Sequence, residues 1–294
     1  MAVTVTHATV AVGTNAGNGE IAKEQWNENH VVTGVRELLT ANRTYYVRTD
    51  GSDSNDGLSN TSGGAWLTPQ KAYDYVSKNL DLGGYTVTVQ FADGTYSGFI
   101  DTGYQGASVL NGALYLRGNL TSPQNCVIGG IYLYQLGGLN FICIAGLTMP
   151  DIQILYSNTV WLGSSPDFNE SGKIRFTGSN PIQVGYGRAF LEIYGTLVFT
   201  ANMGTAISIY AGGVWGYGSY SVTFENSPQT VSTAFLSVTG NSRAYGINAP
   251  GVTGTLTGPR IVASKASTVV GNTGDQTVVP GNSNGTIDAT SVVC

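Results

Sequence analysis

Four carboxylates in the middle of the chain have residue types and spacings that suit acid–base chemistry. Asp167 and Glu170 stand three positions apart in a segment rich in Pro, Asn, Ser and Gly. Glu192 and Glu225 stand in alternating strand patterns, which predict that both side chains project from the outer face of a sheet. Hydrolysis of a glycosidic bond needs two carboxylates about 5 to 9 Å apart. The same residues also suit an ordinary surface turn and solvated strand positions, so both interpretations stay open.

Aromatic residues are the second group with a possible ligand chemistry. Six of them crowd a 35-residue stretch whose corners are rich in glycine: Tyr186, Tyr194, Tyr210, Trp215, Tyr217 and Tyr220. Flat rings beside small polar side chains are what the faces of neutral sugars stack on. Because period-two alternation buries about half of the side chains in a strand, at least one ring is expected to face a sugar. The alternative is a ladder of rings stacked inside or along the fold.

Other catalytic and metal-binding arrangements lack the residues that would form them. His7 and His30 are the only histidines, and both precede the strand-rich part of the chain, which disfavours a Ser/His/Asp or Cys/His site within one protomer. Cys126, Cys143 and Cys294 are too few and too scattered for a disulfide framework or a zinc site. Cys126 and Cys143 lie in apolar strands and are predicted to be buried thiols. We expect no metal and no cofactor.

Charge and hydropathy exclude two further classes of partner. The chain has 13 Lys and Arg against 18 Asp and Glu, a net charge of -5, and no basic cluster that could neutralise phosphates. Nucleic acid is therefore not an expected partner. No apolar run reaches the 18 or so residues that would span a bilayer, and the N-terminus has no basic region before an apolar core. Neither membrane insertion nor a signal peptide is expected.

The elements that would position these side chains begin with one helix. Thr68 and Pro69 give an N-cap and a proline in the first turn, and Ala72 and Val76 recur at helical spacing, which predicts a helix over residues 68–80. The oxygen-rich segment 50–57 before it lacks the ligand alternation and the terminal glutamate of a calcium loop, and is interpreted as a turn capped by its own side chains. Residues 85–91 then alternate as a strand, and residues 93–96 are predicted to be a turn.

Four segments after the helix share one form, a strand followed by a tight corner and another strand. They begin at residues 152, 190, 207 and 234, which predicts coils of about twenty residues with loops of variable length. Charged residues make up only 11% of the chain and glycine 41 of 294 residues, a composition that suits stacked sheets with a neutral surface. A β-sandwich would also give short strands, but it would not explain a single helix placed before all of them.

The first elements resemble the N-terminal cap of right-handed parallel β-helix proteins of the pectate-lyase-like kind, as found in bacteriophage tail spikes and fibres. The matching sequences are YVRTDGSDSNDG at 46–57, PQKA at 69–72 and VTVQFADGTY at 87–96. The resemblance implies an all-β fold in which the helix closes one end of the stack and residues 45–250 form the parallel β-helix. Since this scaffold carries lyases, hydrolases and receptor binders, it implies little about chemistry.

Both ends of the chain resemble segments of phage and prophage proteins. The sequence EQWNENHVVTG at 24–34, with Trp26 and His30, is similar to short segments that attach tail proteins to the virion. Residues 1–44 are accordingly predicted to be an attachment segment that contacts other virion proteins. The sequences GVTGTLTGPR at 251–260 and VPGNSNGT at 279–286 resemble the closing region of prophage fibre proteins. Residues 251–294 are therefore predicted to close the stack and to support trimerisation.

Taken together, the resemblances imply a homotrimeric spike or fibre on the surface of a phage-like particle, made in the bacterial cytoplasm. Its expected role is to bind a polysaccharide of the host surface. A depolymerase, either a glycoside hydrolase or a lyase, is the alternative on the same scaffold, and a purely structural virion component is a third possibility. Composition alone does not choose among the three, because each uses the same neutral, glycine-rich β-helix.

Overall fold

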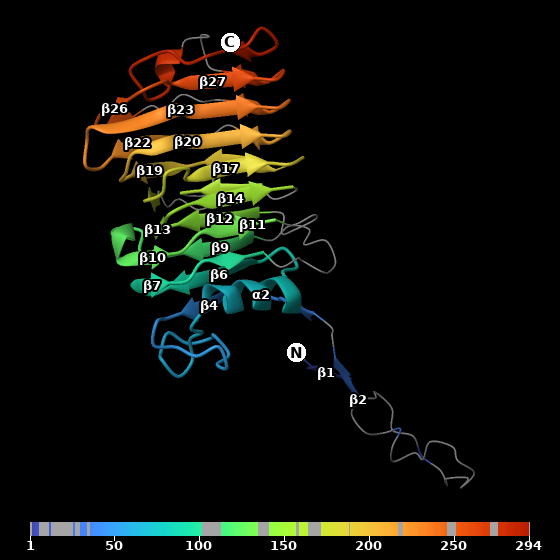
Figure 1. Cartoon of the computed structure of the whole chain (residues 1–294). Coiled ribbons are helices and arrows are strands. Elements are labelled where there is room, and N and C mark those ends of the chain that lie inside the picture. The colour runs from blue at the N-terminus through green and yellow to red at the C-terminus, as the bar shows by residue number, and fades with distance from the viewer. Residues whose placement is uncertain are drawn as a thin grey trace.

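The chain winds into a stack of parallel strands, with a helix at one end and the C-terminal strands at the other (Figure 1). The computed structural model describes residues 2–5, 12, 26, 30–33, 36–101, 113–134, 141–156, 159–163, 172–187, 189–216, 220–245, 251–270 and 276–293. Within these residues the strands form three parallel sheets, of seven, eight and ten strands. This is a right-handed parallel β-helix, as predicted, because each coil is a set of parallel crossovers of the favoured hand.

Each sheet takes one strand from every coil. The seven-stranded sheet contains β7 (Gly94–Tyr96), β10 (Cys126–Ile128), β13 (Leu147–Met149), β16 (Lys173–Phe176), β19 (Gly195–Phe199), β22 (Tyr220–Phe224) and β25 (Gly251–Thr253). The eight-stranded sheet contains β8 (Phe99–Ile100), β11 (Ile131–Leu133), β14 (Ile152–Leu155), β17 (Ile182–Gly185), β20 (Met203–Tyr210), β23 (Gln229–Thr239), β26 (Leu256–Thr257) and β27 (Ile261–Ser264). A coil passes from the first of these sheets to the second and then to the ten-stranded sheet.

The ten-stranded sheet completes the coils and begins before them. It contains β4 (Arg43–Val47), β6 (Thr86–Phe91), β9 (Ala113–Arg117), β12 (Phe141–Ala145), β15 (Thr159–Leu162), β18 (Phe190–Ile193), β21 (Val214–Trp215), β24 (Arg243–Tyr245), β28 (Thr268–Val270) and β29 (Val292–Val293). The remaining elements are the antiparallel pair β1 (Ala2–Val5) and β2 (His30–Thr33), the pair β3 (Glu37–Leu38) and β5 (Leu80–Asp81), the helix α2 (Pro69–Asn79), and the short 3-10 helices η1 (Pro123–Asn125) and η2 (Gln276–Val278).

The core is built from inward-facing side chains that lie directly above one another in successive coils. Phe176, Phe199 and Phe224 form one such row, with ring centroids 5.8 Å apart at each step and near-parallel planes. The predicted buried thiols Cys126 and Cys143 are confirmed, since both are inaccessible to solvent. Identical register in neighbouring coils therefore turns the alternation of each strand into continuous apolar rows.

The helix α2 closes the first coil and confirms the helix predicted over residues 68–80. Thr68 is its N-cap and accepts a hydrogen bond from the backbone N–H of Lys71. The side-chain amide of Gln70 donates to the carbonyl of Ile100 and accepts from its N–H, both at 2.9 Å. Gln70 thus takes the place of a neighbouring strand at the edge of β8, which would otherwise be open.

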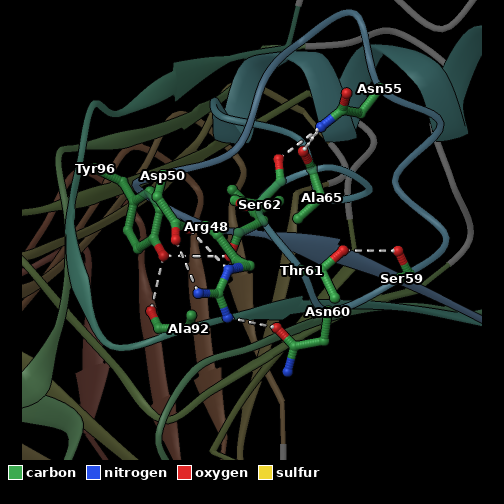
Figure 2. Close-up of polar contacts among 11 residues, drawn as sticks. Arg48, Asp50, Asn55, Ser59, Asn60, Thr61, Ser62, Ala65, Ala92 and Tyr96 are labelled. Carbon is green, nitrogen blue, oxygen red and sulfur yellow. Dashed lines mark hydrogen bonds and ion pairs between the residues drawn. The ribbon is translucent and has the colours of Figure 1, made fainter.

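The acidic turn before the helix is held by hydrogen bonds from its own side chains, as predicted, and their partners lie in the adjoining segments (Figure 2). Asp50 pairs with the Arg48 guanidinium at 2.8 and 3.0 Å. Asp53 accepts from the backbone N–H groups of Leu67 and Thr68 and from the Thr68 hydroxyl. Asp53 therefore fixes the N-cap residue Thr68 and joins the turn to the start of the helix.

The length of the coils and the C-terminal limit of the parallel pairing differ from the sequence-based expectation. Successive strands of the seven-stranded sheet begin 21 to 32 residues apart, so the coils are longer than the predicted twenty residues. The segment at 190 lies in the ten-stranded sheet, whereas those at 152, 207 and 234 lie in the eight-stranded sheet, which explains the underestimate. The parallel pairing also continues past residue 250 through β25 to β29, so these strands extend the β-helix itself.

Replacing Asp53 by alanine should lower the free energy of unfolding by about 2 kcal/mol, because two backbone donors and one hydroxyl lose a charged acceptor. The matched control is Asp50→Ala, because its exposed ion pair with Arg48 is screened by solvent and should contribute much less to stability. Urea denaturation followed by circular dichroism would measure both variants. Equal destabilisation by the two substitutions would contradict the capping role of Asp53.

Candidate functional site

The candidate carboxylates do not form a pair in the described part of the chain. Glu192 lies on β18 in the ten-stranded sheet, half-buried, and accepts a hydrogen bond from the Tyr194 hydroxyl at 3.1 Å. Glu225 directly follows β22 in the seven-stranded sheet and forms an ion pair with Arg175 at 2.9 Å. Because they belong to different sheets, they do not flank a common bond. Asp167 and Glu170 lie outside the described residues.

Two of the six candidate sugar-binding aromatics belong to the core. Trp215 is fully buried on β21 in register with Leu191, and Tyr220 is 2% exposed at the start of β22. Their rings pack against each other in an edge-to-face arrangement, with centroids 5.5 Å apart. The prediction that these two contact a sugar is therefore wrong, because strand alternation points both inward. Tyr217 lies outside the described residues, and Tyr194 is half-buried beside Glu192.

The other candidates, Tyr186 and Tyr210, lie in a surface cluster of tyrosines where the strands β17 and β20 of the eight-stranded sheet end. Tyr186 is 50% exposed, and its ring stacks on that of Tyr156 from the preceding coil at 5.8 Å. The Tyr210 ring meets Tyr186 edge-on at 5.3 Å. Tyr156 and Tyr186 both have left-handed backbone conformations, with φ of 62° and 57°. The repeated corner conformation, unusual for bulky residues, therefore sets two rings side by side on consecutive coils.

Two further tyrosines join this cluster across the outer face of the sheet. Tyr132 and Tyr134 stack at 6.0 Å, and the Tyr134 hydroxyl donates to the Gln153 side-chain oxygen at 2.9 Å. Gln153 stands opposite Gln183 in the next strand. Burial raises the pKa of the Tyr210 phenol, and the nearby phenols of Tyr186, Tyr134 and Tyr156 raise it further. We call the five tyrosines with Gln153 and Gln183 the tyrosine face.

The tyrosine face is neutral as well as aromatic. The described strands of the eight-stranded sheet contain no Asp, Glu, Lys or Arg, whereas β16 and β18 of the other sheets carry Lys173, Arg175 and Glu192. One carboxylate, Asp151, borders the face, where burial and a hydrogen bond to Asp151 raise the pKa of Tyr132. A neutral surface of stacked rings and side-chain amides can bind hydroxyl-rich ligands through ring stacking and hydrogen bonds.

Sequence reasoning missed Tyr132, Tyr134 and Tyr156 because they stand outside the aromatic-rich stretch. They come from earlier coils, and only the pairing of β11 with β14 and of β14 with β17 brings them next to Tyr186. A signal was present in the sequence: Tyr156 and Tyr186 each follow a four-residue strand of the same pattern, IQIL and IQVG. Aligning those two strands would have placed both tyrosines at the same corner.

The two candidate attachment residues, Trp26 and His30, both lie within the described residues. Trp26 is 50% exposed, and His30 begins β2. Within the described residues there is no group of three or more His, Cys, Asp or Glu side chains that could hold a metal ion. In the same part of the chain no helix is both long and apolar enough to cross a membrane.

No protein-family model, curated protein or solved structure matches this chain. Function must therefore be argued from the geometry of the β-helix and of its surface. The feature best suited to binding is the tyrosine face, since the candidate carboxylates Glu192 and Glu225 lie on different sheets and contact other side chains.

Glu192→Gln should lower the pKa of Tyr194 from about 12 toward its ordinary value of 10. Burial is the largest cause of the raised pKa and remains in the variant, but the negative charge of Glu192 that disfavours the phenolate is removed. A pH titration of ring-labelled tyrosines by NMR would follow the change. Glu225→Gln is the control, because Glu225 pairs with Arg175 instead. An unchanged Tyr194 titration in Glu192→Gln would contradict the contact.

Proposed function

We propose that this chain is a spike or fibre protein on the surface of a phage-like particle and that it binds a bacterial surface polysaccharide through the tyrosine face. The observation that carries the proposal is the stacking of Tyr156, Tyr186 and Tyr210 on an outward, partly exposed corner. Aromatic rings left accessible and held in fixed orientations are suited to stack on the apolar faces of sugar rings.

The chemistry of the face favours a neutral glycan. The amides of Gln153 and Gln183 offer both donors and acceptors to sugar hydroxyls, and the described strands of this sheet contain no Lys or Arg to balance a uronate or a phosphate. Asp151 at the border would repel an anionic chain. An uncharged polysaccharide is therefore the preferred class of ligand.

The repeating structure of the face favours a ligand that also repeats. Strands of neighbouring coils lie about 4.8 Å apart, and on two consecutive coils the same groups repeat: Gln153 with Gln183 and Tyr156 with Tyr186. A linear polysaccharide presents the same unit many times and can occupy several of these contacts at once. Weak contacts then add up, because each further one is made by a chain that is already bound.

The remaining parts of the proposal rest on the resemblances to phage proteins. We propose that the protein is a homotrimer, and that residues 1–44 contact other virion proteins. Trp26 in that segment is 50% exposed. The separation of Glu192 from Glu225 on different sheets supports binding in preference to cleavage by that pair.

Tyr186→Ala and Tyr134→Ala should each weaken retention of a neutral surface polysaccharide by about tenfold, because each removes one stacking surface. Tyr85→Ala is the matched control: Tyr85 is 38% exposed, similar to Tyr134 at 37%, but lies outside the tyrosine face. Affinity electrophoresis or glycan arrays with capsule and lipopolysaccharide from candidate hosts would measure retention. Equal loss in all three variants, or no retention by the parent protein, would contradict binding at this face.

The same incubation distinguishes binding from cleavage. Size-exclusion chromatography of the recovered polysaccharide should show an unchanged length distribution. Shortened chains would instead establish a depolymerase, and the substitutions Asp167→Asn, Glu170→Gln, Glu192→Gln and Glu225→Gln would then locate its carboxylates. Neither retention nor cleavage would leave a structural role in the virion.

A further inference from the structure

One inward-facing row of the seven-stranded sheet ends without a cover. Leu147, Ile174, Leu197, Val222 and Val252 occupy equivalent register positions on β13, β16, β19, β22 and β25. The first four are inaccessible to solvent, whereas Val252 is 49% exposed. A side chain in the row that builds the core is thus exposed at the last strand.

The exposure arises because the three sheets end at different levels. After β28 the chain adds one more layer to two of them: Ser283 and Ile287 bridge to Pro259 and Ala263, and β29 pairs with β28. In the described residues no strand pairs with β25 on the side away from β22. In this last layer the 3-10 helix η2 lies beside β25 but does not pair with it as a strand.

A cavity of about 330 Å³ lies between β25 and this last layer. Its walls contain no charged residue; they combine the apolar residues Phe224, Val252, Leu256, Val279 and Pro280 with the polar residues Thr255, Thr277 and Asn282. Gly254 at the rim of the cavity has a φ of +86°, and a Cβ there would lie 2.6 Å from the Phe224 carbonyl oxygen. Glycine therefore lets the backbone approach β22 closely at this edge of the cavity.

We propose that this opening is an acceptor site for an extended strand of a partner polypeptide. The strand pairs with the free edge of β25 and places an aliphatic side chain in the cavity beside Val252. Two observations identify an extended, apolar peptide as the occupant. A free strand edge presents a row of N–H and C=O groups that an extended backbone satisfies. The row from Leu147 to Val252 continues outward at a position that an aliphatic side chain would fill, and uncharged walls disfavour any ionised group there.

The opposite end of the stack shows how an edge is treated when the chain covers it itself. There Gln70 bonds both backbone groups of Ile100 at the edge of β8. Trp66 bridges to Val47 at the edge of β4, and its ring stacks on Tyr45. β25 has neither device within the described residues, and Val252 on it is 49% exposed beside the cavity. The site lies on a different sheet from the tyrosine face and does not depend on the proposed glycan binding.

The test uses a labelled synthetic peptide with the sequence of residues 219–225, SYSVTFE, which copies β22, the strand that already pairs with β25. Fluorescence anisotropy with the full chain should show saturable binding. A peptide with Asp in place of the central Val should bind at least about tenfold more weakly, because it would bring a charge into the apolar cavity. This control leaves the protein itself unchanged.

Two protein variants locate the binding at β25. Val252→Lys should weaken peptide binding by at least about tenfold, whereas Thr253→Lys, on the opposite face of the same strand, should leave it unchanged. Circular dichroism would establish that both variants are folded. Absence of saturable binding, or equal binding by the two variants, would overturn the proposal. Self-association of the protein that is lost in Val252→Lys, with no peptide binding, would also overturn it by assigning the opening to a second copy of this chain.

Discussion

The constraint on which the rest of the structure depends is the shared register of parallel strands in successive coils. Each strand hydrogen-bonds to the same positions of the strands before and after it, so a residue that faces inward in one coil lies on an inward residue of the next. A slip by one position would turn every apolar side chain of a strand outward. The aromatic row of Phe176, Phe199 and Phe224 and the aliphatic row from Leu147 to Val222 both follow from this constraint.

The same register organises the outer surface, where it has consequences for binding. Outward-facing Gln153 and Gln183 are aligned because their strands are, and Tyr156 and Tyr186 are aligned because their coils turn the same corner in the same left-handed conformation. Left-handed conformations cost energy for residues with a side chain, typically about 1 kcal/mol or more. That cost is offset by the backbone hydrogen bond from Tyr156 to Gly185 and by the ring stacking that the corner allows.

Local sequence signals predicted what depends on local structure. The helix over 68–80 and the capped acidic turn were predictable because N-caps, helical periodicity and Asx turns operate over a few residues. Residues 93–96 were predicted to be a turn, yet Gly94–Tyr96 form β7, because pairing with Cys126–Ile128 overrides a local preference. Trp215 and Tyr220 stood among six candidate rings of which about half were expected to be buried, and the sequence did not show which, because corners of unknown length hide which phase of the alternation faces inward. The tyrosine face could not be assembled from sequence for the same reason: its members come from several coils.

Repetition places different demands on binding and on catalysis. Catalysis needs one asymmetric set of groups, such as two carboxylates at a fixed separation, and Glu192 and Glu225 stand on different sheets with partners of their own. Binding can instead be distributed over equivalent positions in several coils.

A stack of coils must also end somewhere, and its last strand keeps the hydrogen-bonding capacity that built the stack. The chain covers the first edge with Gln70 and Trp66, whereas β25 keeps an exposed core valine beside a cavity. The property that stabilises the fold, continuation by one more parallel strand, is therefore also what makes its open end a recognition surface.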